Sequence, residues 1–114
     1  STESLAELNG RLEDPVPMNR FRPNFVVTAG TSYAEDEWTE IQIGGIGFRA
    51  VKPCVRCVVV TVDQQTGQGG TEPLRTLSSY RKTDGGVTFG QNLVHLDRGT
   101  IRAFSRVELL ESEW

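Results

Sequence analysis

The stretch EIQIGGIGFRAV, residues 40–51, decides the fold of this chain. β-Branched and aromatic residues stand on both sides of Gly44-Gly45, and such a glycine pair is typical of a tight hairpin turn. The stretch therefore predicts two antiparallel strands. FVVTAG (25–30) before it and CVVVTVD (57–63) after it have the same texture, so we expect three or four strands in this part of the chain.

The last third of the chain predicts two or three more strands. GVTFGQNLVHL (86–96) and GTIRAFSRVELL (99–110) are again rich in β-branched and aromatic residues, with Gly and Asp between them. Many short strands with isolated helices favour a mainly β fold, a closed or half-closed β-barrel with two short helices, over a parallel α/β sheet.

Two segments have helical spacing. In residues 1–12 three leucines recur at i, i+3 and i+7, and Ser4 and Glu7 fit a capping box. The segment 71–81 places Pro73 in a first-turn position and predicts a second, shorter helix.

Length and charge exclude several kinds of partner. A chain of 114 residues predicts a single domain. Its 12 Lys and Arg against 15 Asp and Glu give a net charge of -3, which argues against nonspecific binding to nucleic acid or to an anionic membrane. No apolar run is long enough to span a bilayer, so we expect a soluble, cytoplasmic protein.

The chain contains only two cysteines, both in KPCVRC, residues 52–57. A structural zinc site needs four ligands and only His95 could be added, so we expect no zinc. A redox dithiol would sit at the start of a helix, but the residues that follow predict a strand. The pair could be two small apolar residues at the entrance of a strand. Alternatively, the cations Lys52 and Arg56 could favour a thiolate that binds a soft metal, or could suit an anionic cofactor.

Other candidate motifs are weaker. TGQGGT lacks the Gly-Lys-Ser/Thr ending of a P-loop. His95 alternates with apolar residues in a strand, and we assign it no role. YAEDEW (33–38) has three consecutive acids whose side chains do not converge, so we interpret it as a solvated loop.

The order of several short segments resembles the MOSC domain family, which includes molybdenum cofactor sulfurases and molybdenum-dependent reductases of N-hydroxylated compounds. The resemblance covers nearly the whole chain and rests on SLAELNGRL, NRFRPNFVV, YAEDEW, IQIG, KPCVRC, TVDQQTG, EPLRTLSSYR and FGQN. TVDQQTG (61–67) and FGQN (89–92) resemble the bacterial MOSC-domain reductases and the mitochondrial amidoxime-reducing component more than the sulfurases.

The resemblance implies a set of site residues. Cys54 would be the protein thiolate on molybdenum, with Arg56 offsetting negative charge and Cys57 packed behind the ligand. Arg22 and Asn24 would hold the pterin of the molybdenum cofactor (Mo-molybdopterin). The remaining residues that match family motifs would line the pocket: Tyr80, Arg81, Phe89, Gly90, Gln91 and Asn92.

The resemblance also implies a reaction and partners. The chain would belong to an oxidoreductase that reduces amidoximes and other N-hydroxylated compounds, with electrons from a separate reductase or a ferredoxin-type domain. We expect residues 1–114 to be one MOSC domain, a C-terminal fragment that is inactive alone. The longer protein would carry the family's N-terminal β-rich, MOSC-associated domain in cis. The alternative is a noncatalytic cofactor carrier or sulfuration module, which a neighbouring pyridoxal-phosphate-dependent desulfurase domain would favour.

Overall fold

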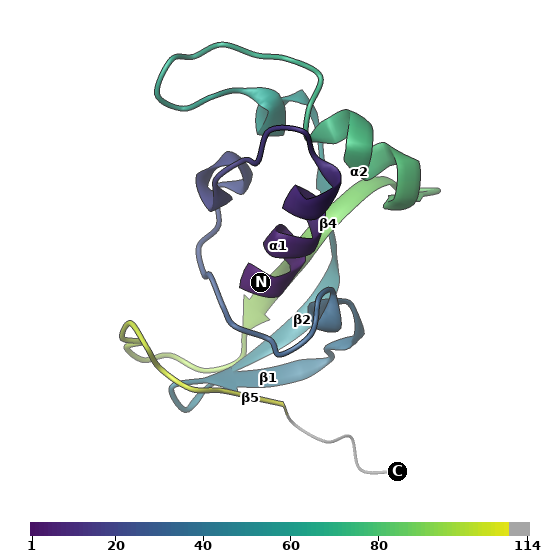
Figure 1. Ribbon diagram of the computed structural model, residues 1–114. Coiled ribbons are helices and arrows are strands. Elements are labelled where there is room, and N and C mark those ends of the chain that lie inside the picture. The colour runs from purple at the N-terminus through teal and green to yellow at the C-terminus, as the bar shows by residue number, and fades with distance from the viewer. Residues whose placement is uncertain (110–114) are drawn as a thin grey trace.

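The computed structural model describes residues 1–109 and shows one antiparallel sheet with its two α-helices in the upper half of the view (Figure 1). The strands lie in the order β3-β4-β2-β1-β5. Their bounds are β1 Glu40–Ile43, β2 Ile46–Arg56, β3 Lys82–Thr83, β4 Gly86–His95 and β5 Val107–Leu109. The mainly β class with two α-helices is therefore confirmed.

The predicted hairpin is present. Strands β1 and β2 pair antiparallel, with Ile41 opposite Phe48 and Ile43 opposite Ile46. Gly44 and Gly45 have φ values of 57° and 85°. Left-handed backbone at both turn residues matches the twist of the flanking strands and is open to glycine at no steric cost.

The sheet does not close into the predicted barrel within residues 1–109, because it ends at β3 on one side and β5 on the other. One reason is that residues 25–30 form no strand. Their backbone groups bind the first helix instead: Thr2 N–H donates to Val27 O at 2.9 Å, and the amides of Ala29 and Gly30 both donate to the Glu3 carboxylate at 2.8 Å.

The strand expected over residues 57–63 is also absent. Strand β2 ends at Arg56, and Val58–Thr61 form a 3-10 helix, η3. Val60 turns into the core while Val58 stays exposed, so burial of one valine overrides the β propensity of the run. Of the strand expected over 99–110, only β5 forms, and Leu110 lies outside the described residues.

Both predicted helices form. Helix α1 spans Thr2–Arg11 and α2 spans Leu74–Tyr80. The N-cap of α1 is Ser1, whose Oγ accepts from Ser4 N–H, so the predicted capping box at Ser4 and Glu7 is wrong. None of the helices in residues 1–109 is long and apolar enough to cross a membrane.

Two hydrophobic clusters support the fold. The first lies around α1, α2 and β4 and contains Leu8, Leu77 and the stacked rings of Phe21 and Phe89, whose centroids are 4.4 Å apart. The second lies on the β1–β2 hairpin and contains Ile41, Ile43 and Phe48.

Candidate functional site

A β-bulge in the β2–β4 pairing shapes the site. Pro53 pairs with Gln91 and Val55 with Thr88, so two residues of β4, Phe89 and Gly90, oppose the single residue Cys54. Gly90 has a φ of +84°, the left-handed backbone that such bulges often place on a glycine. A bulge re-aims the side chains beside it, and Cys54 lines the main cavity of the protein.

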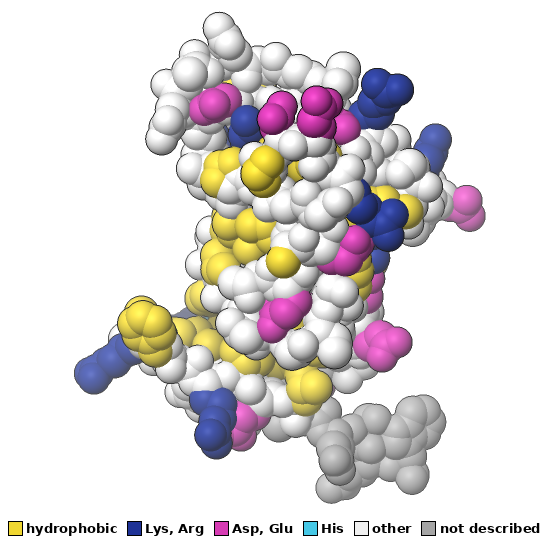
Figure 2. Space-filling view, in the orientation of Figure 1, with side chains coloured by type: hydrophobic (Ala, Val, Ile, Leu, Met, Phe, Trp, Pro, Cys, Tyr) yellow, Lys and Arg dark blue, Asp and Glu magenta, His cyan; other side chains and the backbone are white. Residues whose placement is uncertain are grey.

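That cavity has a volume of about 470 Å³. It lies between the two hydrophobic clusters, since Phe21 and Phe89 of the first and Ile41 and Phe48 of the second all line it. Figure 2 shows hydrophobic side chains gathered into a band on the face in view, with charged side chains mostly around its margin. The size is typical of a small-molecule or cofactor site.

Eight of the residues named from the sequence lie together on the cavity wall: Arg22, Asn24, Cys54, Arg56, Phe89, Gly90, Gln91 and Asn92. They come from the loop at residues 22–24, from β2, and from residues 89–92 of β4, three segments that are far apart in the sequence. Arg22 follows η1, the 3-10 helix Met18–Phe21, and itself has a left-handed φ of 48°.

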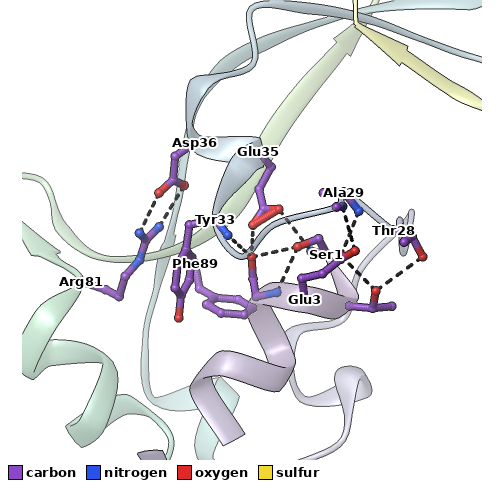
Figure 3. A network of polar contacts seen from close by, with 12 residues as sticks. Ser1, Glu3, Thr28, Ala29, Tyr33, Glu35, Asp36, Arg81 and Phe89 are labelled. Atoms are coloured by element: carbon purple, nitrogen blue, oxygen red, sulfur yellow. Dashed lines mark hydrogen bonds and ion pairs between the residues drawn. The ribbon is translucent and has the colours of Figure 1, made fainter. Parts of the chain in front are cut away.

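Tyr80 and Arg81, also named from the sequence, do not line the cavity but support its wall from behind. The hydroxyls of Tyr80 and Tyr33 are 2.5 Å apart, and the Tyr33 ring meets the edge of Phe89. Arg81 donates to both oxygens of Asp36, at 2.6 and 2.9 Å, and stacks over Tyr33 (Figure 3). Burial raises the pKa of both tyrosines, and the hydrogen bond to Asp36 raises the pKa of Arg81.

Arg56 connects the two parts of the wall. Its Nε donates to Phe89 O at 2.8 Å and its Nη1 donates to Phe21 O at 2.9 Å. Within the described residues no carboxylate forms an ion pair with it, and burial lowers its pKa. A partly buried cation without a carboxylate partner favours an anion in the cavity.

Cys57 contradicts the expectation that it packs behind Cys54. It follows the end of β2 and is exposed to solvent, whereas Cys54 is partly buried. The expectation fails because the chain turns into η3 at this point instead of continuing as a buried strand. In residues 1–109, no three His, Cys, Asp or Glu side chains come close enough to hold a metal ion.

The TVDQQTG segment supports the Arg22 loop. Arg20 Nη1 donates to Thr61 O at 3.3 Å, and the Gln64 side chain donates to Asn19 O. Asp63 closes its own turn, with Gly67 N–H donating to its carbonyl at 2.7 Å. The segment therefore fixes the loop that carries Arg22 without lining the cavity itself.

Sequence reasoning missed two titratable side chains of the cavity wall, Glu35 and His95. Glu35 lies in the stretch interpreted as solvated, yet it is 3% exposed, lines the cavity and accepts a hydrogen bond from Ser4 Oγ. His95, to which we assigned no role, also lines the cavity. Its position on the cavity wall could have been predicted, because in a strand His95 shares a face with Gln91 and Leu93.

Comparison with known proteins shows the family of this chain. The sequence model described as the MOSC domain matches residues 1–108, and the chain belongs to the MOSC domain family. Human mitochondrial amidoxime-reducing component 1 is 43% identical over 96% of this chain and 35% of its own length. Bovine mitochondrial amidoxime reducing component 2 is 47% identical over 74% of this chain and 25% of its own.

The sulfurases of the family are similar as well. The molybdenum cofactor sulfurase of Solanum lycopersicum is 40% identical over 79% of this chain and 13% of its own length. The chain thus spans about a third, or less, of the length of the curated relatives it matches.

Proposed function

We propose that this chain is the cofactor-binding part of a molybdenum-dependent reductase that removes oxygen from N-hydroxylated compounds such as amidoximes and N-hydroxylated bases. The observation that carries the proposal is the convergence of Cys54, Arg22, Asn24 and Gln91 on one cavity. The similarity to proteins named amidoxime-reducing components supports the choice of substrate.

The residues present fit a molybdenum cofactor. A thiolate from Cys54 suits a soft, sulfur-rich metal centre. Arg22 has no carboxylate partner within residues 1–109 and suits a phosphate, which guanidinium groups bind with two parallel hydrogen bonds. The side chains of Asn24 and Gln91 both donate and accept, as the edge of a pterin ring requires.

When bound, the cofactor would supply the two-electron redox chemistry that converts an N–OH group and two protons into N–H and water. The chain's own residues would hold and shield it. Cys54 would offer one thiolate, and Arg56 would balance negative charge beside it. The stacked rings of Phe21 and Phe89 would exclude water from one wall.

The partners are part of the same proposal. The two cysteines cannot hold an iron–sulfur cluster, so electrons would come from a separate reductase or a ferredoxin-type domain. An N-terminal MOSC-associated domain in cis would complete the cavity, and human mitochondrial amidoxime-reducing component 1, about three times as long as this chain, has room for one. The sequence-based prediction of a cytoplasmic location has no support from the relatives. Two of them have names that begin with the word mitochondrial, which supports a mitochondrial location.

The test uses the full-length gene product loaded with molybdenum cofactor. With an artificial electron donor it should reduce benzamidoxime or 6-hydroxylaminopurine, and Cys54→Ser should not. A loaded protein that reduces neither compound contradicts the proposal.

A noncatalytic carrier or sulfuration module is the second candidate, because the tomato sulfurase is nearly as similar as the reductases. Transfer of sulfur to a cofactor without reduction of either compound would favour it. A pyridoxal-phosphate-dependent desulfurase domain in the same full-length chain would point the same way.

A further inference from the structure

The bulge opposite Cys54 leaves backbone groups that the strand ladder does not pair. Phe89 and Gly90 have no register partner of their own in β2. The Phe89 carbonyl is instead bound by Nε of Arg56, two residues after Cys54 on the same strand. A buried carbonyl that lost this donor would lack a partner, so the contact helps to keep the bulge in place.

The same guanidinium fixes a second segment. Nη1 of Arg56 binds Phe21 O, directly before Arg22, and the group lies 5.2 Å from the centre of the Phe21 ring. Only arginine presents separate N–H groups in a rigid plane that reaches two carbonyls at once. Lysine keeps the charge but not this geometry.

The absence of a side chain at Gly90 leaves room for the guanidinium of Arg56. A Cβ at position 90 would lie 3.3 Å from Arg56 Nη2, closer than side chains normally approach, and the φ of +84° disfavours any other residue. The free space at Gly90 is therefore occupied by the end of the Arg56 side chain.

We propose that Arg56 is a positioning residue that, together with Gly90, holds the bulge in β4 and thereby keeps the cavity wall opposite Cys54, beside Arg22, in place. This rests on the proposed function for its catalytic meaning, since Cys54 would be the metal ligand. If β4 lost the bulge, its own alternation would change by one residue, so side chains of β4 that now lie opposite Cys54 on the cavity wall would turn to the other face of the sheet.

The first test needs no cofactor and uses the 114-residue chain, with the exposed Cys57 as an internal reference. In Arg56→Lys and in Gly90→Ala, the alkylation rate of Cys54 relative to Cys57 should rise several-fold, and amide exchange should speed up at residues 88–91. Arg49→Lys and Gly30→Ala are matched controls, because within residues 1–109 the Arg49 side chain bonds only Glu40, and Gly30 has a similar left-handed φ of +89° with nothing within 4 Å of an added Cβ. In neither control should the alkylation ratio or the amide exchange at residues 88–91 differ from wild type.

The effects should also be coupled. The alanine methyl at position 90 would press on Nη2 of Arg56, an atom that lysine lacks. Gly90→Ala should therefore lower the free energy of unfolding less in the Arg56→Lys chain than in the wild type. The double variant should then lose less stability than the sum of the two single losses. Should Arg56→Lys fail to fold, Gly90→Ala alone decides through the alkylation ratio. Wild-type ratios and exchange in whichever of the two variants folds would overturn the proposal.

The second test separates this inference from the proposed function. Full-length Arg56→Lys should retain less molybdenum than wild type after gel filtration, with Arg49→Lys unaffected. If the Cys54 to Cys57 alkylation ratio changes in the variants but the full-length protein does not reduce an amidoxime, the positioning role is kept and the reductase is rejected. If the ratio does not change but the full-length protein is an active reductase, the positioning role is rejected and the reductase is kept.

Discussion

Cys54 lines the cavity, whereas Cys57, three residues further along the chain, is exposed. Cys57→Ser should therefore change the free energy of unfolding by no more than about 0.5 kcal/mol, because exposed substitutions away from special features have small effects. Urea unfolding of the wild type and of Cys57→Ser measures this difference in free energy. A cost above about 2 kcal/mol would mean that the thiol is buried as the sequence suggested.

Glu3 should make stability depend on pH. The amides of Ala29 and Gly30 lower its pKa from 4.5 to about 2, so the folded state favours the ionised form. Its stabilising contribution is therefore fully present above pH 4.5 and is lost as the pH falls towards 2. The difference in unfolding free energy between wild type and Glu3→Gln should shrink over this range.

The control for Glu3 is Glu13→Gln, since Glu13 is exposed and has no side-chain hydrogen bond within residues 1–109. The Glu3→Gln difference from wild type should change more with pH than the Glu13→Gln difference does. If it does not, the hydrogen bonds from the amides of Ala29 and Gly30 to the Glu3 carboxylate do not form in solution.

Gly10 is a site where the protein can be stabilised. It lies in the last turn of α1, and a Cβ there would meet nothing within 4 Å. Gly10→Ala should raise the unfolding free energy by about 0.5 kcal/mol through helix propensity, the low end of the range for a helix interior. Gly45→Ala is the matched contrast: nothing lies nearby there either, yet the φ of +85° should make alanine cost about 1 kcal/mol. Thermal melting of both variants checks the sign; a Gly10→Ala chain that melts below wild type refutes the helix.

Tyr80 should matter for stability and not for cofactor retention. Tyr80→Phe removes the hydroxyl bonded to Tyr33 and should cost about 0.5 to 1.5 kcal/mol. Gln91→Ala, on the cavity wall, should instead lower the molybdenum content of full-length protein. If Tyr80→Phe lost molybdenum and Gln91→Ala did not, the placement of the two residues relative to the cofactor would be wrong.

The sequence was sufficient where a local signal agreed with the tertiary structure. The Gly44-Gly45 hairpin formed because the turn chemistry and the strand pattern favour the same structure. Most motif residues also converge on one cavity, although spacing alone could not show that residues 22–24 meet residues 89–92. Arg56 joins the two segments through hydrogen bonds to Phe21 O and Phe89 O, and the stacked rings of Phe21 and Phe89 join them as well.

The failures lie where a tertiary contact replaced a local preference. Residues 25–30 read as a strand, but the Glu3 carboxylate binds their amides. The valines after Cys57 also predict a strand, yet only Val60 is buried and the chain turns there. Glu35 reads as a solvated acid because nothing in YAEDEW indicates that Ser4 will bond it. Such pairings join residues that are about thirty positions apart, and a periodicity search does not detect them.

X-ray absorption at the molybdenum edge of full-length protein tests the central claim most directly. If Cys54 binds the metal, the wild type should show one more sulfur neighbour than Cys54→Ser, because a protonated hydroxyl is a poor ligand for a soft metal centre. Cys57→Ser should give the wild-type count. Equal sulfur counts in wild type and Cys54→Ser would contradict the account, because Cys54 would then not be bound to molybdenum.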